Sequence, residues 1–329
     1  MANVESPHEP QRDVGATFGT AATEYAADRA VGAQREGGPE DETGGRSQLQ
    51  LATRRFLHHR MALIGLGIFL LLVAVTFIAP HFWKWNYAQI TPSYASGPSA
   101  SHPFGTDTIG HDLFAQVLRA TQTSLKSAFI VTVIATVFGT VIGAVAGYYG
   151  KLADAALMRF TDLVLTVPLL ALLLVLANIL SRQASNYLYI AIIIAAVLWT
   201  YLARLVRGTF LSLREHDYVI AARAIGSTNK RIIFRHMIPN AIGPIVVNAT
   251  LTVANAILIE SALSFLGFGI QPPNVSLGNL INSGQGSATT EWWLFAFPAG
   301  VLVIIILAVN FVGDGLRDAL DPRQTRVRA

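Results

Sequence analysis

Cysteine is absent from this 329-residue chain, and charged residues make up only 13% of it. The absence of cysteine excludes disulfide bonds, thiolate metal ligands and a cysteine nucleophile. Soluble domains usually carry about 25% charged residues. The low charge, together with 52% hydrophobic residues, therefore indicates a chain whose main solvent is lipid. The net charge of +4 does not indicate a nucleic-acid partner, because the basic residues stand beside long apolar runs.

Nucleotide-binding and hydrolytic motifs are also missing. The only Gly-Lys pair is Gly150-Lys151, and Leu152 follows it where a phosphate-binding loop needs Ser or Thr. Neither a His-Glu-x-x-His zinc motif nor a Gly-x-Ser-x-Gly nucleophile elbow occurs. We therefore expect no enzymatic activity, no metal site and no cofactor of the chain's own. If the chain works in active transport, a partner subunit must bind the ATP.

Apolar runs without charge dominate the rest of the sequence. Each approaches or exceeds the roughly 20 residues needed to cross about 30 Å of hydrocarbon. Because open strands would leave backbone groups unsatisfied in lipid, the predicted fold is an all-α membrane protein with six transmembrane helices. The runs are 61–80, 127–150, 163–181, 183–203, 241–259 and 292–313.

The runs divide the chain into five segments. Residues 1–50 have too few large apolar side chains to fold and are predicted to be a disordered cytoplasmic tail. The other segments are an N-terminal transmembrane helix (51–80), an extracytoplasmic loop (81–121), a core of five transmembrane helices (122–316) and a cytoplasmic tail (317–329).

Lys and Arg near the span ends predict the orientation. Arg54, Arg55 and Arg60 precede the first run, so both termini of this multi-pass protein should be cytoplasmic. The short connection at Arg182, Gln183, Ser185 and Asn186 joins two runs on the outer side. Glu260 lies at the end of a run, where a functional role and an interfacial role are equally compatible with the pattern.

The segment 217–240 is basic and lies between two apolar runs. Asp217 is predicted to cap a short helix that begins at Tyr218, and Gly226 suits the left-handed conformation that ends a helix. Ser227 or Thr228 can cap a second short helix, which Pro239 limits. From these features alone, a helix lying on the membrane surface and a docking element for a soluble partner are equally supported.

The same segment resembles the EAA loop of the permease subunits of bacterial ABC importers. Ile220 stands where that family has its Glu, and Arg235-His236-Met237-Ile238-Pro239-Asn240 reads as in peptide importers. The resemblance implies that the loop docks into a groove on a cytoplasmic ATPase, with small residues as its core and basic residues steering. The residues implied are Asp217, Ala221, Ala222, Arg223, Gly226, Lys230, Arg231 and Pro239.

A second segment, 102–125, resembles the stretch before the second span of dipeptide and oligopeptide importer permeases. Two glycines are predicted to make turns, and Asp112 to cap an amphipathic helix that leads into the span. His102 and His111 are expected to be polar outer-surface residues and not metal ligands. The residues that match the family are Gly105, Thr106, Asp107, Gly110 and Asp112.

Three shorter patterns complete the prediction. Gly143 and Gly147 form a small-xxx-small pair, for which packing within the chain is preferred to a dimerisation face. Arg159 and Asp162 lie one helical turn apart and are expected to pair at the surface. The segment from Ser264 to Gly278 resembles a family segment on the outer side, and its prolines end the fifth helix.

Together the matches cover about residues 50–325 and resemble the C-type permease of the peptide and nickel importer family. The resemblance implies a type I ABC importer permease fold and a pathway for di- or oligopeptides, with nickel or another small solute as the alternative cargo. It implies four kinds of partner: a second homologous permease, two ABC ATPases or one fused ATPase, an extracytoplasmic substrate-binding protein, and membrane lipid. Substrate-binding residues are not indicated.

Two other classes of protein remain as alternatives at this point. One is an intramembrane enzyme using Ser276, His102 or Glu260, and the other is a secondary carrier that works alone. No catalytic constellation supports the enzyme, and few intramembrane ionisable groups are present for a proton-coupled carrier.

Overall fold

The computed structural model describes residues 48–179 and 186–321. The predicted tail 1–50 and the connection at Arg182, Gln183 and Ser185 therefore lie almost wholly outside the described residues. Contacts divide the chain into two units, Met1–Gln48 and Leu49–Ala329, and the helices belong to the second unit apart from the first residue of α2.

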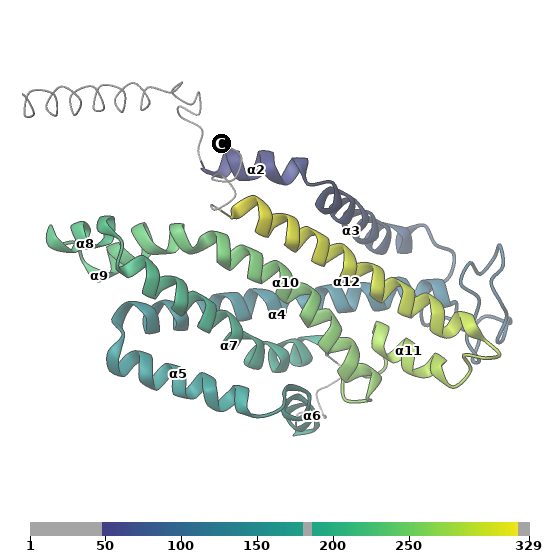
Figure 1. The fold of residues 1–329 in the computed structure, drawn as a ribbon. Helices are drawn as coiled ribbons and strands as arrows, with labels where there is room; N and C mark the ends of the chain where they lie inside the picture. The colour runs from purple at the N-terminus through teal and green to yellow at the C-terminus, as the bar shows by residue number, and fades with distance from the viewer. Residues whose placement is uncertain (1–47, 180–185, 322–329) are drawn as a thin grey trace, which may run out of the picture. The chain divides into compact units, whose positions relative to one another are not determined.

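The described part of the chain is almost entirely helical, as predicted (Figure 1). Within it, extended pairing is limited to two isolated bridges. The helices are α2 (Gln48–His58), α3 (Arg60–Ile78), α4 (Leu113–Tyr149), α5 (Lys151–Thr166), α6 (Leu169–Ile179), α7 (Tyr187–Arg214), α8 (Asp217–Ala224), α9 (Asn229–Arg231), α10 (Ile238–Phe265), α11 (Leu277–Gln285) and α12 (Trp292–Leu320), with a 3-10 turn η1 (Ala79–His81) and a π-helical segment η3 (Ile232–Met237).

Five continuous helical stretches are long and apolar enough to cross a membrane. A sixth span is obtained if the bent pair of α5 and α6 is counted as one, so the prediction of six spans is matched in that sense. The five stretches are Arg60–His81, Leu113–Tyr149, Tyr187–Arg214, Asn229–Phe265 and Trp292–Leu320.

The third predicted span, 163–181, is wrong as a single helix. The structure divides it between α5 and α6, which are bent by 87°. The cause is Pro168, whose ring disfavours a helical conformation at the residue before it. Val167 accordingly has an extended backbone (φ −80°, ψ 133°) and ends α5.

Helix α4 packs closely along α7, and its glycines make this possible. A Cβ atom built on Gly139 would lie 2.8 Å from the carbonyl oxygen of Trp199, and one on Gly143 would lie 2.4 Å from that of Ala203. One on Gly147 would lie 2.6 Å from Cβ of the α7 residue Phe210. Small residues thus let the two backbones approach. The expectation that Gly143 and Gly147 serve packing within the chain is confirmed.

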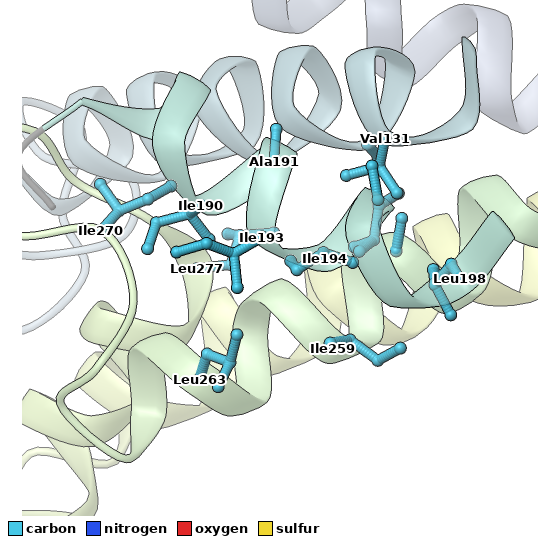
Figure 2. Packing of buried hydrophobic residues seen from close by; sticks show 14 of the residues in the cluster. Val131, Ile190, Ala191, Ile193, Ile194, Leu198, Ile259, Leu263, Ile270 and Leu277 are labelled. Carbon is cyan, nitrogen blue, oxygen red and sulfur yellow. The ribbon is translucent and has the colours of Figure 1, made fainter. Parts of the chain in front are cut away.

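The main hydrophobic core lies where α4, α7, α10 and α11 meet (Figure 2). Ile190 and Ile194 of α7 and Leu263 of α10 belong to this cluster, while Leu277 comes from α11. The buried side chains are aliphatic and β-branched, which suits close interdigitation of helices in both lipid and water. This core fixes α10 and α7, the two helices that flank the basic segment, relative to each other.

Two ion pairs join α5 to the second half of α7. Asp162 pairs with Arg204 and not with Arg159, so that prediction was wrong. Asp154 forms a bidentate pair with Arg207, with one N–O distance of 2.6 Å between Nη2 and Oδ2. Because α7 leads directly into α8, these pairs help to fix the start of the basic segment 217–240.

Candidate functional site

Helix α8 opens the basic segment. It begins at Asp217, but the capping position is His216, whose side chain makes no capping bond, so the predicted cap was wrong. The Asp217 carboxylate instead lies in the first turn, where it is favourable to the helix dipole. Burial raises the pKa of the adjacent Tyr218 hydroxyl, a side chain that is neutral near pH 7 in any case.

The turn after α8 is built as the sequence predicts. Gly226 has φ +78°, and its N–H donates to the carbonyl of Arg223 while Ser227 N–H donates to that of Ala222. Thr228 then caps the next helix by accepting a hydrogen bond from the N–H of Arg231 (3.4 Å). The sharp turn at Gly226 thus separates α8 from the helix that continues into the membrane.

Pro239 does not limit a short second helix, so that prediction was wrong. Helix α9, the π-helical segment η3 and α10 run on continuously, and together they form the stretch Asn229–Phe265. A proline cannot donate to the carbonyl four residues before it, and its ring crowds that carbonyl. The hydrogen bond that Pro239 cannot make is missing next to Ile232–Met237, where the π-helical turns already depart from the regular α-helical hydrogen bonding.

One face of α8 is fixed to the helix bundle. Val219 and Ala222 are buried, with Ala222 only 6% exposed, and they pack in a cluster with Phe210 of α7 and with Ile232 and Met237. A displacement of α8 must therefore be transmitted to α7 and to the start of α10. Ala222, predicted to be part of a docking core, faces inward.

The exposed surface of α8, its turn and the residues that follow is unusually apolar. Ile220, Ile225 and Phe234 are 50%, 83% and 68% exposed. The other predicted loop residues on this surface are exposed too: Asp217, Ala221, Arg223, Gly226, Lys230, Arg231 and Pro239. Sequence reasoning missed Ile225 and Phe234, although isolated large apolar residues in a basic segment were the available signal. We call this surface the α8 knob.

The α8 knob is also attached to α4. The Tyr148 hydroxyl donates to Oδ1 of Asn229 (2.8 Å), and the guanidinium of Arg223 lies 5.7 Å from the centre of the Tyr148 ring. This arrangement gives Arg223 a cation–π contact in addition to its exposed charge. The knob thus touches the three helices α4, α7 and α10.

The loop 82–112 carries the second set of predicted residues, and it is tightly hydrogen-bonded. Gly105 and Gly110 have φ of +78° and +97°, as turns require. Asp107 accepts hydrogen bonds from the N–H groups of Ile109 (2.9 Å) and His111 (2.7 Å). The His111 ring lies 2.8 Å from the same carboxylate. These residues organise the loop.

Asp112 is the centre of this loop. It is fully buried, caps α4 by accepting from the N–H of Ala115 (2.7 Å), and accepts from Trp83 Nε1 (3.0 Å). The cap was predicted and is confirmed. His102 Nδ1 lies 2.7 Å from the other carboxylate oxygen, and His102 is only 4% exposed. The expectation of an outer-surface His102 was therefore wrong, because Trp85 stacks on its ring and Asp112 pairs with it.

Replacing Asp112 with alanine is expected to lower the free energy of unfolding by at least about 2 kcal/mol, because a helix cap and buried hydrogen bonds are lost together. Thermal unfolding of the detergent-solubilised protein measures this. The control is Asp318→Ala, which removes an exposed pair with His59 and should cost less than about 1 kcal/mol. Equal effects of the two substitutions would contradict the account of the loop.

Glu260 does not lie at a water-facing edge of its helix. It is fully buried in α10, and its carboxylate accepts from the hydroxyls of Ser124 (2.7 Å) and Ser264 (2.8 Å). Ser276, also fully buried, caps α11 beside it. The structure brings Glu260 and Ser276 together but places His102 in the Asp112 cluster. In the described ranges, no group of three or more His, Asp or Glu side chains is arranged to hold a metal ion.

The family described as "binding-protein-dependent transport system inner membrane component" matches residues 139–326, which include α7, α8 and α10. The chain belongs to this family. A second family description, "N-terminal TM domain of oligopeptide transport permease C", matches residues 47–101, which include α3.

Relatives of this inner membrane component match over nearly their whole length. The oligopeptide transport system permease protein OppC of Mycobacterium tuberculosis is 41% identical over 86% of this chain and 97% of its own. The dipeptide transport system permease protein DppC of Alkalihalophilus pseudofirmus is 36% identical over 87% and 93%. These relatives are permease subunits, and this chain is accordingly a multi-pass membrane protein of the permease class.

Solved structures show the same fold. A chain of the MetNI methionine ABC transporter in an inward-facing conformation superposes with a TM-score of 0.52 at 18% identity, over 64% of this chain and 98% of that chain. A second crystal form gives 0.50 at 19% identity. This inner membrane component therefore has the ABC importer permease fold that its sequence predicts.

Proposed function

We propose that the chain is a permease subunit of an ATP-driven importer of di- or oligopeptides and that the α8 knob is its contact with a cytoplasmic ATPase. The α8 knob carries this proposal because it exposes large apolar side chains on a basic, water-soluble segment. Ile225, at 83% exposed, lies between the exposed Arg223 and Lys230, and such an apolar residue rimmed by charged ones is typical of a protein-docking surface. The names of the relatives support peptides as the cargo.

The complex we infer contains three further kinds of protein subunit. A second homologous permease completes the pathway, and two ATPase subunits or one fused ATPase lie beneath it. An extracytoplasmic binding protein delivers the cargo to the side that holds the loop 82–112. The excess of Lys and Arg near α8 and before α3 supports cytoplasmic termini in a bacterial cell membrane.

The mechanism follows from the attachment of the α8 knob. ATP binding closes the ATPases and displaces the knob that they hold. Because Val219 and Ala222 pack against Phe210, the displacement is passed to α7, and through η3 to α10. The helices then rock between inward-open and outward-open arrangements, a two-state equilibrium that the nucleotide biases.

The test is reconstitution of the complex copurified with this chain, together with its binding protein, in proteoliposomes. We expect an ATP-binding subunit and a second permease in the complex, and ATP-dependent uptake of labelled tri-alanine. Uptake of a nickel chelate instead would replace the cargo but keep the subunit role. Uptake by this chain alone, without ATP, would overturn the proposal in favour of a secondary carrier.

A further inference from the structure

Three asparagines lie on two apolar spans, and their side-chain amides have no hydrogen-bond partner among the described residues. Asn255 of α10 is exposed, and Asn248 of α10 and Asn310 of α12 are partly exposed. Asn248 and Asn255 are seven residues apart, so they lie two turns apart on one face of α10. By contrast, the Thr250 hydroxyl on the same helix donates to the carbonyl of Val246 (3.0 Å).

This face of α10 is only partly covered by the protein itself, since Asn255 is exposed and Asn248 partly exposed. Helix α10 packs on α4, α7 and α12, and Figure 1 shows α10 beside α12 with α4 behind them. A Cβ built on Gly313 of α12 would lie 2.8 Å from Cδ2 of Leu251. Asn310, one turn before Gly313 on an antiparallel helix, therefore lies at a level between Asn248 and Asn255.

Lipid does not account for this face. An amide without a hydrogen-bond partner is strongly disfavoured in hydrocarbon, and three of them lie within a few turns. The face also carries no exposed charge, because Glu260, the only charged residue of α10, is fully buried on another side with Ser124 and Ser264. The molecule that covers this face must be polar, must need no charged partner, and must carry both a hydrogen-bond donor and an acceptor.

We infer that Asn248, Asn255 and Asn310 line a water-filled cargo pathway and bind the backbone amides of the peptide in transit. This inference rests on the proposed function. An asparagine side chain offers an NH₂ donor and a carbonyl acceptor, the same pair that every peptide bond presents. Amides of this kind bind the backbone of any sequence, and the absence of charge avoids selection for or against charged side chains of the cargo.

Cysteine scanning tests this directly, because the natural chain contains no cysteine. Single cysteines at Asn248, Asn255 and Asn310 are treated with a charged, membrane-impermeant methanethiosulfonate in the reconstituted complex, and labelling is read as the mass shift of this chain. We expect labelling at all three positions and protection by tri-alanine. The control is Leu71→Cys on α3, an exposed apolar position (64%) that should stay unlabelled.

Uptake gives the second readout. Asn255→Leu should lower the initial rate of tri-alanine uptake about tenfold, as loss of one hydrogen bond predicts. Asn255→Gln should retain the rate within about twofold, as should the matched control Thr250→Val, which makes a polar-to-apolar change on the same helix. Asn255→Asp should favour tri-lysine over tri-glutamate about tenfold, because a charge replaces the neutral amide.

The outcomes separate this inference from the proposed function. If the cysteines resist the charged reagent while the parent complex still transports peptide, the pathway assignment is wrong and the proposed function stands. Labelling without protection, together with unchanged uptake by Asn255→Leu, overturns the pathway assignment as well. A parent complex that transports no peptide overturns the proposed cargo and the backbone-binding role together.

Discussion

Replacing Gly143 with leucine is expected to prevent assembly of the folded protein. The first side-chain atom alone would lie 2.4 Å from the carbonyl oxygen of Ala203 and 2.8 Å from Cβ of Val206, so the α4 and α7 backbones would have to separate. Overpacking of a close contact costs about 1–3 kcal/mol when the neighbours can adjust. Here the neighbour is backbone, so we expect a loss above that range and no monodisperse protein after detergent extraction.

Gly208→Leu on α7 is the matched control. A Cβ at Gly208 meets nothing within 4 Å, so the same change of residue adds no clash and should leave the yield and the unfolding midpoint near those of the parent. If Gly143→Leu gave a normal yield, the close packing of α4 on α7 would be contradicted.

Replacing Gly226 with valine is expected to leave the protein folded but to uncouple it. A left-handed conformation costs a residue with a Cβ about 1–2 kcal/mol, which lowers the population of the native turn about 5- to 30-fold. A Cβ at Gly226 meets nothing within 4 Å, so no packing is lost. Membrane levels should be normal, while cargo-stimulated ATP hydrolysis and tri-alanine uptake fall together.

The substitution Gly226→Asn separates backbone conformation from loss of glycine itself. Asparagine tolerates the left-handed region better than valine does, so coupling should be largely retained. Normal uptake by the valine variant would mean that the shape of this turn is not required. Equal loss in both variants would point to a contact that needs glycine's lack of a side chain.

Local features with a single physical cause were predictable from the sequence. Long charge-free runs can satisfy their backbone in lipid only as helices, and the helices lie where the runs are. The positive φ of Gly226 and the caps by Thr228 and Asp112 were also predicted, because each depends on the chemistry of a few adjacent residues.

Features that depend on distant partners were not predictable. His102 was expected at the surface, but Trp83 and Trp85 converge on the His102–Asp112 pair and bury it. Asp162 pairs with Arg204, which is 42 positions away, and not with its helical neighbour. No local pattern reports such a choice of partner.

The prolines were predicted to interrupt helices, but the positions at which helices end were predicted wrongly. Pro168 breaks a span that we expected to continue, whereas Pro239 sits in a helix that we expected to end. The difference lies in the surroundings. At Pro168 the preceding residue turns to an extended conformation, while at Pro239 the π-helical segment η3 already departs from the regular ladder.

The central claim is that the α8 knob is held by an ATP-hydrolysing subunit. The most direct test is a single cysteine at Ile225, the most exposed large apolar residue of the knob at 83%, in the otherwise cysteine-free chain. In native membrane vesicles, a bifunctional thiol–amine reagent attached there should cross-link this chain to an ATP-binding protein, and a cysteine at Ile109 in the loop 82–112 should not. Capture of lipid or a second copy of this chain alone, with no ATP-binding protein, would contradict the account.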